Sequence, residues 1–170
     1  MRRCSPEEAF QLKYPEPIAL AVSYDEQNRR PNIITLGWFM RTSFSPPMCA
    51  ISVGHTRHSH TTIGRSGEFV LVLPSPHQAD AVLHCGTVSG RDHDKFAETG
   101  LKALPATAVR PPLIEGAVLA LECRTVGRCE SGDHTIFIGE VLAGHIAEKP
   151  QAPLFSLQDG SIQPLPPVTV

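Results

Sequence analysis

Short apolar runs, each bounded by turn-forming residues, recur along the chain and predict β-strands. Several of them are rich in β-branched residues, and the run at 48–53 is apolar almost throughout, which is typical of a strand buried on both faces. Polar turns at 25–31 and 130–133, and a loop with two prolines at 43–47, separate neighbouring runs. The predicted strands are residues 18–24, 32–40, 48–53, 68–73, 117–126 and 135–146.

Helical signals are few and short. Three candidate helices carry such signals: a serine N-cap followed by proline in the first, apolar residues at helical spacing in the second, and a glycine just after the second and the third. In the third of these we expect Phe96 to be buried and Gly100 to end the helix. Residues 56–65 fit either a short helix or a loop. The predicted helices are residues 5–12, 76–85 and 92–99.

Regularly spaced strands with turn signals favour a closed antiparallel barrel over alternating β-α-β units. The predicted fold class is therefore mostly β, an antiparallel split β-barrel with short α insertions. The length of 170 residues suits a single domain. We expect its core at about residues 15–145 and an arm at 150–170, where the chain is rich in proline and would lie on another surface.

Composition excludes several classes of protein. Charged residues make up 19% of the chain and the net charge is -2, which argues against disorder and against nucleic-acid binding. No run of 18 apolar residues predicts a membrane span, and no apolar stretch follows Met1 as it would in a secretory leader. A cytoplasmic location is the simplest interpretation. The five cysteines include no Cys-x-x-Cys pair, so we expect reduced thiols without a catalytic role.

Three common motifs are missing from the sequence. It has no Gly-x-Gly-x-x-Gly after a strand, no Gly-x-x-x-x-Gly-Lys-Ser/Thr, and no Gly-x-Ser-x-Gly. A nicotinamide or phosphate ligand would therefore be bound in another way.

The segment 32–38 places Asn32, Thr35 and Trp38 at a spacing of three residues. Such a strand offers side-chain hydrogen bonds and an aromatic wall to a heterocycle. The alternative is an ordinary core strand with Trp38 as a large core residue.

The segment 52–62 carries one arginine, three histidines and several hydroxyl groups after the end of a predicted strand. A guanidinium fork, hydroxyl donors and the N–H groups of a helix start are what a phosphate monoester needs. The spacing of His55, His58 and His60 also permits a metal, although no nearby cysteine or carboxylate completes a ligand set. A solvated polar turn is the third interpretation.

Two later segments combine charge with a predicted element boundary. Residues 89–96 surround a helix start with two cations and two acids, which fits either helix capping or the binding of an anion. Residues 132–141 open a strand with Asp133 and His134. This histidine could touch a ligand at the strand mouth, or it could be a turn residue oriented by Asp133.

Taken in order, these segments resemble the flavin reductase-like FMN-binding family, and its flavoredoxin branch most closely, over about residues 15–145. The motifs that carry the resemblance are Asn-x-x-Thr-x-x-Trp, Ser-x-x-Pro-Pro, Arg-x-Ser-His, Ser-Gly-Arg-Asp-x-Asp-Lys-Phe and Gly-Asp-His-Thr-x-Phe-x-Gly-Glu-Val. The resemblance implies a split β-barrel, usually a homodimer, with FMN between the subunits. The chain departs from the family at Ser59, where threonine is more frequent, and at His58, where tyrosine is familiar.

The resemblance also implies roles for individual residues. His134, the implied catalytic residue, would face the flavin ring, and Lys95 would lie at the flavin and stabilise its anionic reduced form. Arg57 and Ser59 would lie near the phosphate. The full implied cofactor-binding set is Asn32, Thr35, Trp38, Ser52, Arg57, Ser59, His60, Arg91 and Lys95, with no metal-ligating residue.

The implied function is that of an FMN-binding oxidoreductase, either a flavin reductase or a flavoredoxin-like protein. Electrons would pass from NAD(P)H or a redox protein through bound FMN to a second acceptor. One alternative is a non-enzymatic electron carrier for a protein partner. Another is a haem- or metal-binding barrel that uses the three histidines of segment 52–62.

Overall fold

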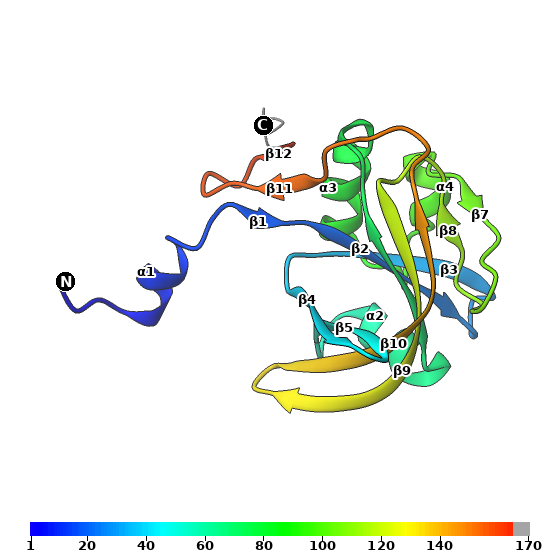
Figure 1. Cartoon of the computed structure of the whole chain (residues 1–170), viewed down its shortest axis with the longest axis horizontal. Helices are drawn as coiled ribbons and strands as arrows, with labels where there is room; N and C mark the ends of the chain where they lie inside the picture. The colour runs from blue at the N-terminus through cyan, green and yellow to red at the C-terminus, as the bar shows by residue number, and fades with distance from the viewer. Residues whose placement is uncertain (165–170) are drawn as a thin grey trace.

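The computed structural model describes residues 1–164, and its centre is one curved, seven-stranded antiparallel sheet (Figure 1). The strand order is β3-β2-β6-β9-β10-β5-β4. These strands are β2 (Ala19–Asp25), β3 (Arg30–Leu36), β4 (Phe39–Phe44), β5 (Pro47–Gly54), β6 (Glu68–Leu73), β9 (Leu119–Ser131) and β10 (His134–Ile146). The predicted mostly β, antiparallel fold class is confirmed.

Two small sheets and five helical segments complete the described chain. The small sheets have the orders β1-β11-β12 and β7-β8. Their strands are β1 (Glu16–Pro17), β7 (Ala103–Leu104), β8 (Leu113–Ile114), β11 (Leu154–Ser156) and β12 (Ile162–Pro164). The helices are α1 (Pro6–Phe10), α2 (His58–Ser66), the 3-10 turn η1 (Pro76–Gln78), α3 (Ala79–Thr87) and α4 (Lys95–Thr99). None of the helices in residues 1–164 is both long and apolar enough to cross a membrane.

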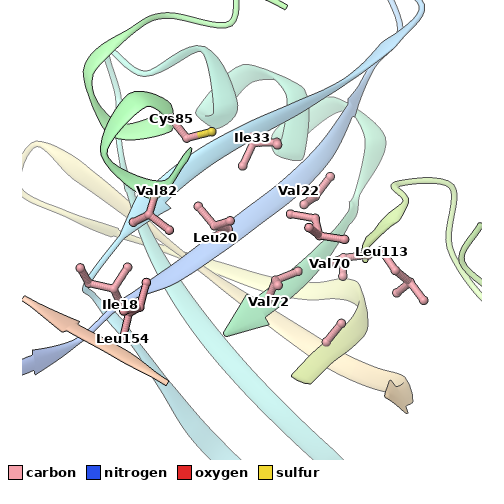
Figure 2. Close-up of a cluster of buried hydrophobic side chains, with 12 residues drawn as sticks. Ile18, Leu20, Val22, Ile33, Val70, Val72, Val82, Cys85, Leu113 and Leu154 are labelled. Carbon is pink, nitrogen blue, oxygen red and sulfur yellow. The ribbon is translucent and has the colours of Figure 1, made fainter. Parts of the chain in front are cut away.

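The central strand β2 has hydrophobic clusters on both of its faces. Leu20 and Val22 belong to a cluster that α3 covers with Val82, as Figure 2 shows. Ala19 and Ala21 belong to the other cluster, which contains the buried Phe69 and Phe137. Successive side chains of a strand point to opposite faces, so an uninterrupted apolar run is what this position requires. The same holds for β5, where the adjacent Ala50 and Ile51 are both buried, as predicted.

Several predicted element boundaries are wrong. The strand predicted at 32–40 is two strands, because β3 ends at Leu36 and β4 begins at Phe39. The loop predicted at 43–47 shrinks to a two-residue turn, since Phe44 already pairs with Pro47. β9 extends five residues beyond the predicted end at Val126, because it follows β10 to the tight turn at Gly132.

The helices follow their capping residues. Ser5 caps α1, and residues 58–66 form a helix, which settles the choice left open for that segment. α4 begins three residues later than predicted because Asp94 is its N-cap. Its buried residue is Lys95, whereas Phe96 is only partly buried against the core, so the expectation for Phe96 is wrong.

The arm predicted at 150–170 is wrong for the part that the structure describes. β11 pairs with β1, and Leu154 is fully buried in the core cluster of Figure 2. Residues 165–170 of the predicted arm lie outside the described residues. The segment that extends away from the body is instead the N-terminal one, since α1 stands apart in Figure 1 and buries no residue.

Candidate functional site

A cavity of about 200 Å³ opens where the start of α2 meets the end of α3. β3 forms one wall with Ile34 and Thr35, and the end of α3 with the loop that follows it, from Gly86 to Arg91, forms another. Five of the residues predicted to bind a cofactor line it, from four separate parts of the chain. They are Thr35, Arg57, Ser59, Arg91 and Lys95.

The lining of this cavity is cationic, although the whole chain has a net charge of -2. Arg57, Arg91 and Lys95 line it, and no aspartate or glutamate of residues 1–164 does. α2 begins at the cavity, and its N-cap residue Arg57 makes no side-chain capping bond. The N-terminal end of a helix carries positive partial charge, so the cavity favours an anion.

Lys95 is buried, with 4% of its surface exposed. Its ammonium group donates to the carbonyl oxygens of Ile33 at 2.8 Å and of Cys85 at 2.7 Å. Burial lowers the pKa of Lys95, Cys85 opposes that shift, and Arg57 adds to it. The same burial raises the pKa of the Cys85 thiol to about 11. The backbone therefore holds a cation at the cavity wall.

Ser59 is also buried, and its hydroxyl accepts a hydrogen bond of 2.8 Å from the side-chain amide of Asn32. Asn32 is not among the residues that line the cavity, because its side chain lies behind Ser59 and against Gly90. Thr35 lines the cavity, but its hydroxyl donates to the carbonyl of Val82 at 2.6 Å. Of Asn32, Thr35 and Ser59, Ser59 is therefore the best candidate for a direct contact with a ligand.

Trp38 and His134 form an aromatic pair beside the cavity. Their ring centroids are 4.8 Å apart with an interplanar angle of 44°. Trp38 is 55% exposed, so the alternative that made it a core residue is wrong. The pair adjoins Arg57 through Gly54, where a Cβ would lie 3.4 Å from His134 Nε2 and 3.6 Å from Arg57 Cγ. A flat ligand at this rim would meet an aromatic surface next to the cationic cavity.

The exposed carboxylate of Asp133 orients His134. The contact from His134 Nδ1 to Asp133 Oδ1 is 2.6 Å, and this bond lowers the pKa of Asp133. Nε2 of His134 lies toward Gly54 and so stays on the side of Arg57. His134 is thus oriented by Asp133 and also lies beside the cavity, so the two interpretations of this histidine are compatible.

The structure does not bring Ser52 and His60 to the cavity. Ser52 lies inside β5, and its backbone N–H donates to the carbonyl of Trp38. His60 hydrogen-bonds Thr135 at 2.8 Å and packs on Phe137. Side chains alternate along β10, so His60 lies on the face opposite to His134. Burial, above all, lowers the pKa of His60.

The three histidines of segment 52–62 do not converge. His55 contacts Glu130 at 3.0 Å, His58 contacts Asp25 at 2.7 Å, and His60 contacts Thr135. Among residues 1–164 no group of three His, Cys, Asp or Glu side chains could hold a metal ion. This geometry gives the metal-binding alternative no support.

Sequence reasoning did not select several residues of the cavity. His58 lines it next to Arg57, and the buried Asp25 holds its Nε2. Gly90 passes so close to Asn32 that a Cβ would lie 1.8 Å from Asn32 Oδ1. The signal for Gly90 was present, since it belongs to the motif Ser-Gly-Arg-Asp, but only the contact explains why glycine stands there.

The structure resembles solved flavoproteins over nearly all of its length. It matches a flavoredoxin from Methanosarcina acetivorans with a TM-score of 0.83 and 26% identity, covering 92% of this chain and 88% of that one. It matches a flavoredoxin of Desulfovibrio vulgaris (Miyazaki F) with a TM-score of 0.83 and 25% identity, covering 92% and 90%. The fold is thus that of the split-barrel flavoproteins, as predicted.

The sequence narrows this class to a family. The model of the flavin reductase like domain matches residues 12–165, so the chain belongs to the flavin reductase-like family. An NADH-dependent FMN reductase from Streptomyces nodosus subsp. asukaensis is 32% identical over 138 residues, which cover 81% of this chain and 74% of that protein. A protein of Archaeoglobus fulgidus is 37% identical, with 76% of this chain and 71% of that protein covered. The predicted family is confirmed.

Proposed function

We propose that this protein binds FMN and transfers electrons through it, as a flavin reductase or a flavoredoxin-like protein. The phosphate would lie in the cationic cavity and the ring against Trp38 and His134. Bound FMN would supply the redox chemistry, while the chain binds the phosphate, orients the ring and shields it from water.

The observation that carries the proposal is the cavity, whose lining has three cations and, among the described residues, no carboxylate. Arg57 presents a guanidinium fork that matches phosphate geometry. Arg91 and Lys95 add two further charges, and the uncapped start of α2 adds backbone N–H groups. A dianionic phosphate satisfies this arrangement, whereas a neutral group would leave the cations without counter-charge.

The cavity alone is smaller than usual ligand pockets, which run from roughly 300 Å³ upward. It suits the phosphate end of FMN, and the ring would extend to the rim. Part of that ring would remain open on one subunit. We therefore propose a homodimer in which a second copy covers it.

Exposed apolar groups support the dimer. A groove of about 310 Å³ beside β4 is lined mainly by apolar side chains, and Met40 and Phe44 within it are 58% and 83% exposed. Phe10 on α1 is 68% exposed as well. An exposed apolar patch can mark a protein-protein interface. Sedimentation giving a monomer at micromolar concentration would contradict this part of the proposal.

His134 is the proposed catalytic residue. The bond to Asp133 fixes its Nδ1, which leaves Nε2 toward the side where Arg57 lies. At that position the imidazole can hold or release a proton next to the ring when the flavin is reduced. The family resemblance implied a place for Lys95 at the ring, but Lys95 lines the cavity with Arg57 and Arg91, so we propose that its charge faces the phosphate.

The electron donor distinguishes an enzyme from a carrier. A relative is described as an NADH-dependent FMN reductase, which favours NAD(P)H as donor, whereas the flavoredoxins are the neighbours that favour a carrier and a protein partner. The experiment is to load the protein with FMN, remove the excess by gel filtration and record the visible spectrum. We expect retained flavin bands that NADH or NADPH bleaches within the time of turnover. Retained bands that no nicotinamide bleaches would favour the carrier, and a colourless protein would overturn the proposal.

A further inference from the structure

Behind the cavity lies a small network of buried polar side chains that joins β2, β3 and α2. Its members are Ser23, Asn32, Ser59 and Thr62, each with 4% or less of its surface exposed. The amide nitrogen of Asn32 donates to Ser59 Oγ at 2.8 Å and to Ser23 Oγ at 3.3 Å. Both amide protons are therefore used.

The orientation of this amide follows from its other neighbour. Asn32 Oδ1 has no hydrogen-bond partner within residues 1–164 and lies against the backbone of Gly90. Turning the amide over would place its two N–H groups against that CH₂ group, with no acceptor for either. One unpaired acceptor costs less than two unpaired donors, so the nitrogen faces the hydroxyl groups.

The Asn32 amide and the backbone carbonyl of Ser59 together set the directions of the hydroxyl protons in the network. Thr62 donates to the carbonyl of Ser59 at 3.2 Å, so the bond of 2.6 Å between Thr62 and Ser23 has Ser23 as its donor. Ser59 accepts from Asn32, which leaves its own proton to donate elsewhere. Among the described residues no protein group accepts that proton, and Ser59 lines the cavity.

We infer that Asn32 is a positioning residue that makes the Ser59 hydroxyl a hydrogen-bond donor toward the phosphate of the bound flavin. This inference rests on the proposed function. Phosphate oxygens only accept hydrogen bonds, so a serine that could present its lone pairs would bind them less well. Gly90 takes part because it alone lets the loop close over Asn32: a methyl group there would lie 1.8 Å from Oδ1 and displace the amide.

The test compares FMN with riboflavin, which has the same ring and no phosphate. Asn32→Ala and Ser59→Ala are each expected to lower the affinity for FMN by roughly ten-fold, the effect of one hydrogen bond to a charged group, and to change riboflavin much less. In the Ser59→Ala background, Asn32→Ala should cause no further change in the ratio of the two affinities. Ser23→Ala is the matched control, since it removes a network hydroxyl but keeps the bond from Asn32 to Ser59.

A purely structural role for Asn32 predicts equal losses of affinity for FMN and for riboflavin, or a further fall in the ratio of the two affinities in the Ser59→Ala background. Either result overturns the inference. If Asn32→Ala does not fold, Asn32→Asp keeps the shape, and its carboxylate takes the Ser59 proton. In the Ser59→Ala background, Asn32→Asp then reports only the effect of the added negative charge. If the ratio of FMN to riboflavin affinity falls in Arg57→Ala but stays at the wild-type value in both Asn32 variants, this inference alone is refuted. If the wild type does not bind FMN, the proposed function is refuted.

Discussion

The cavity and the aromatic rim beside it are built in different ways. In the cavity wall, Lys95 and Ser59 are almost fully buried, and each is held by hydrogen bonds to the protein. At the rim, Trp38 is more than half exposed, and the carboxylate that orients His134 lies in solvent. The proposed phosphate end of the site is therefore preorganised by one chain, whereas the proposed ring end is open to solvent in one chain. Changes in the cavity wall should have large and ligand-specific effects, and changes at the rim should have small and unspecific ones.

The largest effect is expected at Lys95. Lys95→Met keeps the length of the side chain but leaves the carbonyls of Ile33 and Cys85 without their donor. Each buried unpaired carbonyl costs about 1–3 kcal/mol, so the free energy of unfolding should fall by about 2–6 kcal/mol in urea denaturation. Lys102→Met, at an exposed lysine paired with Glu115 at 3.4 Å, is the control and should change little. Equal stabilities of the two variants would contradict the account of the wall.

Glu122 carries a buried charge that takes no part in the proposed binding site. Burial alone would raise its pKa, but the backbone N–H groups of Thr107 and Ala108, and the ring of His145, lower the pKa to about 2. Because the pKa in the folded state is below the ordinary 4.5, the resulting stability is complete above pH 4.5 and is lost as the pH falls from 4.5 toward 2.

Glu122→Gln should accordingly lower the free energy of unfolding at pH 7 by about 3 kcal/mol and flatten its dependence on pH between 4.5 and 2. The ratio of FMN to riboflavin affinity should stay at the wild-type value, since this change is only structural. A shift of that ratio would show that the cavity is not an independently built part of the molecule.

A smaller effect is expected at the rim. Trp38→Ala removes an aromatic contact, and such contacts are worth about 0.5–1.5 kcal/mol. FMN and riboflavin should both bind roughly two- to ten-fold more weakly, by the same factor, in fluorescence titrations. A loss confined to FMN would place the phosphate, and not the ring, beside Trp38.

The smallest effect on electron transfer is expected from the buried thiols. Cys49 and Cys123 lie 3.5 Å apart, Sγ to Sγ, inside the core cluster that contains Phe69. Cys123→Ala should lower the free energy of unfolding by about 1 kcal/mol, the usual effect of a core truncation of this size. The rate at which a reductant bleaches bound flavin should be unchanged in stopped-flow measurements. A slower rate with binding intact would give these thiols a redox role.

The sequence predicted the strands of the large sheet, except for the break between β3 and β4, together with the fold class and the family, because an apolar pattern and a set of ordered motifs are local signals. It also selected Arg57, Ser59, Arg91 and Lys95, which the fold gathers around one cavity. It placed the described part of the C-terminal arm, residues 150–164, wrongly, since nothing local reveals that Leu154 completes the core next to β1.

The sequence could not show which polar residues are available to a ligand and which are hydrogen-bonded within the protein. Asn32 and Thr35 have the right chemistry for a ligand, but the fold engages Asn32 with Ser59 and Thr35 with a backbone carbonyl. His134 was the implied catalytic residue and His60 an implied cofactor-binding residue, but the alternation of side chains along β10 places the two histidines on opposite faces. Such distinctions depend on contacts between residues that are distant in the sequence.

The measurement that tests the central claim most directly is the affinity of the wild type and of Arg57→Ala for FMN and for riboflavin. Charge-assisted hydrogen bonds to a phosphate are worth about 1.5–3 kcal/mol each, so Arg57→Ala should weaken FMN binding by roughly ten- to a hundred-fold. The affinity for riboflavin should fall much less. Equal losses for the two ligands, or no loss for either, would contradict the placement of the phosphate in the cationic cavity.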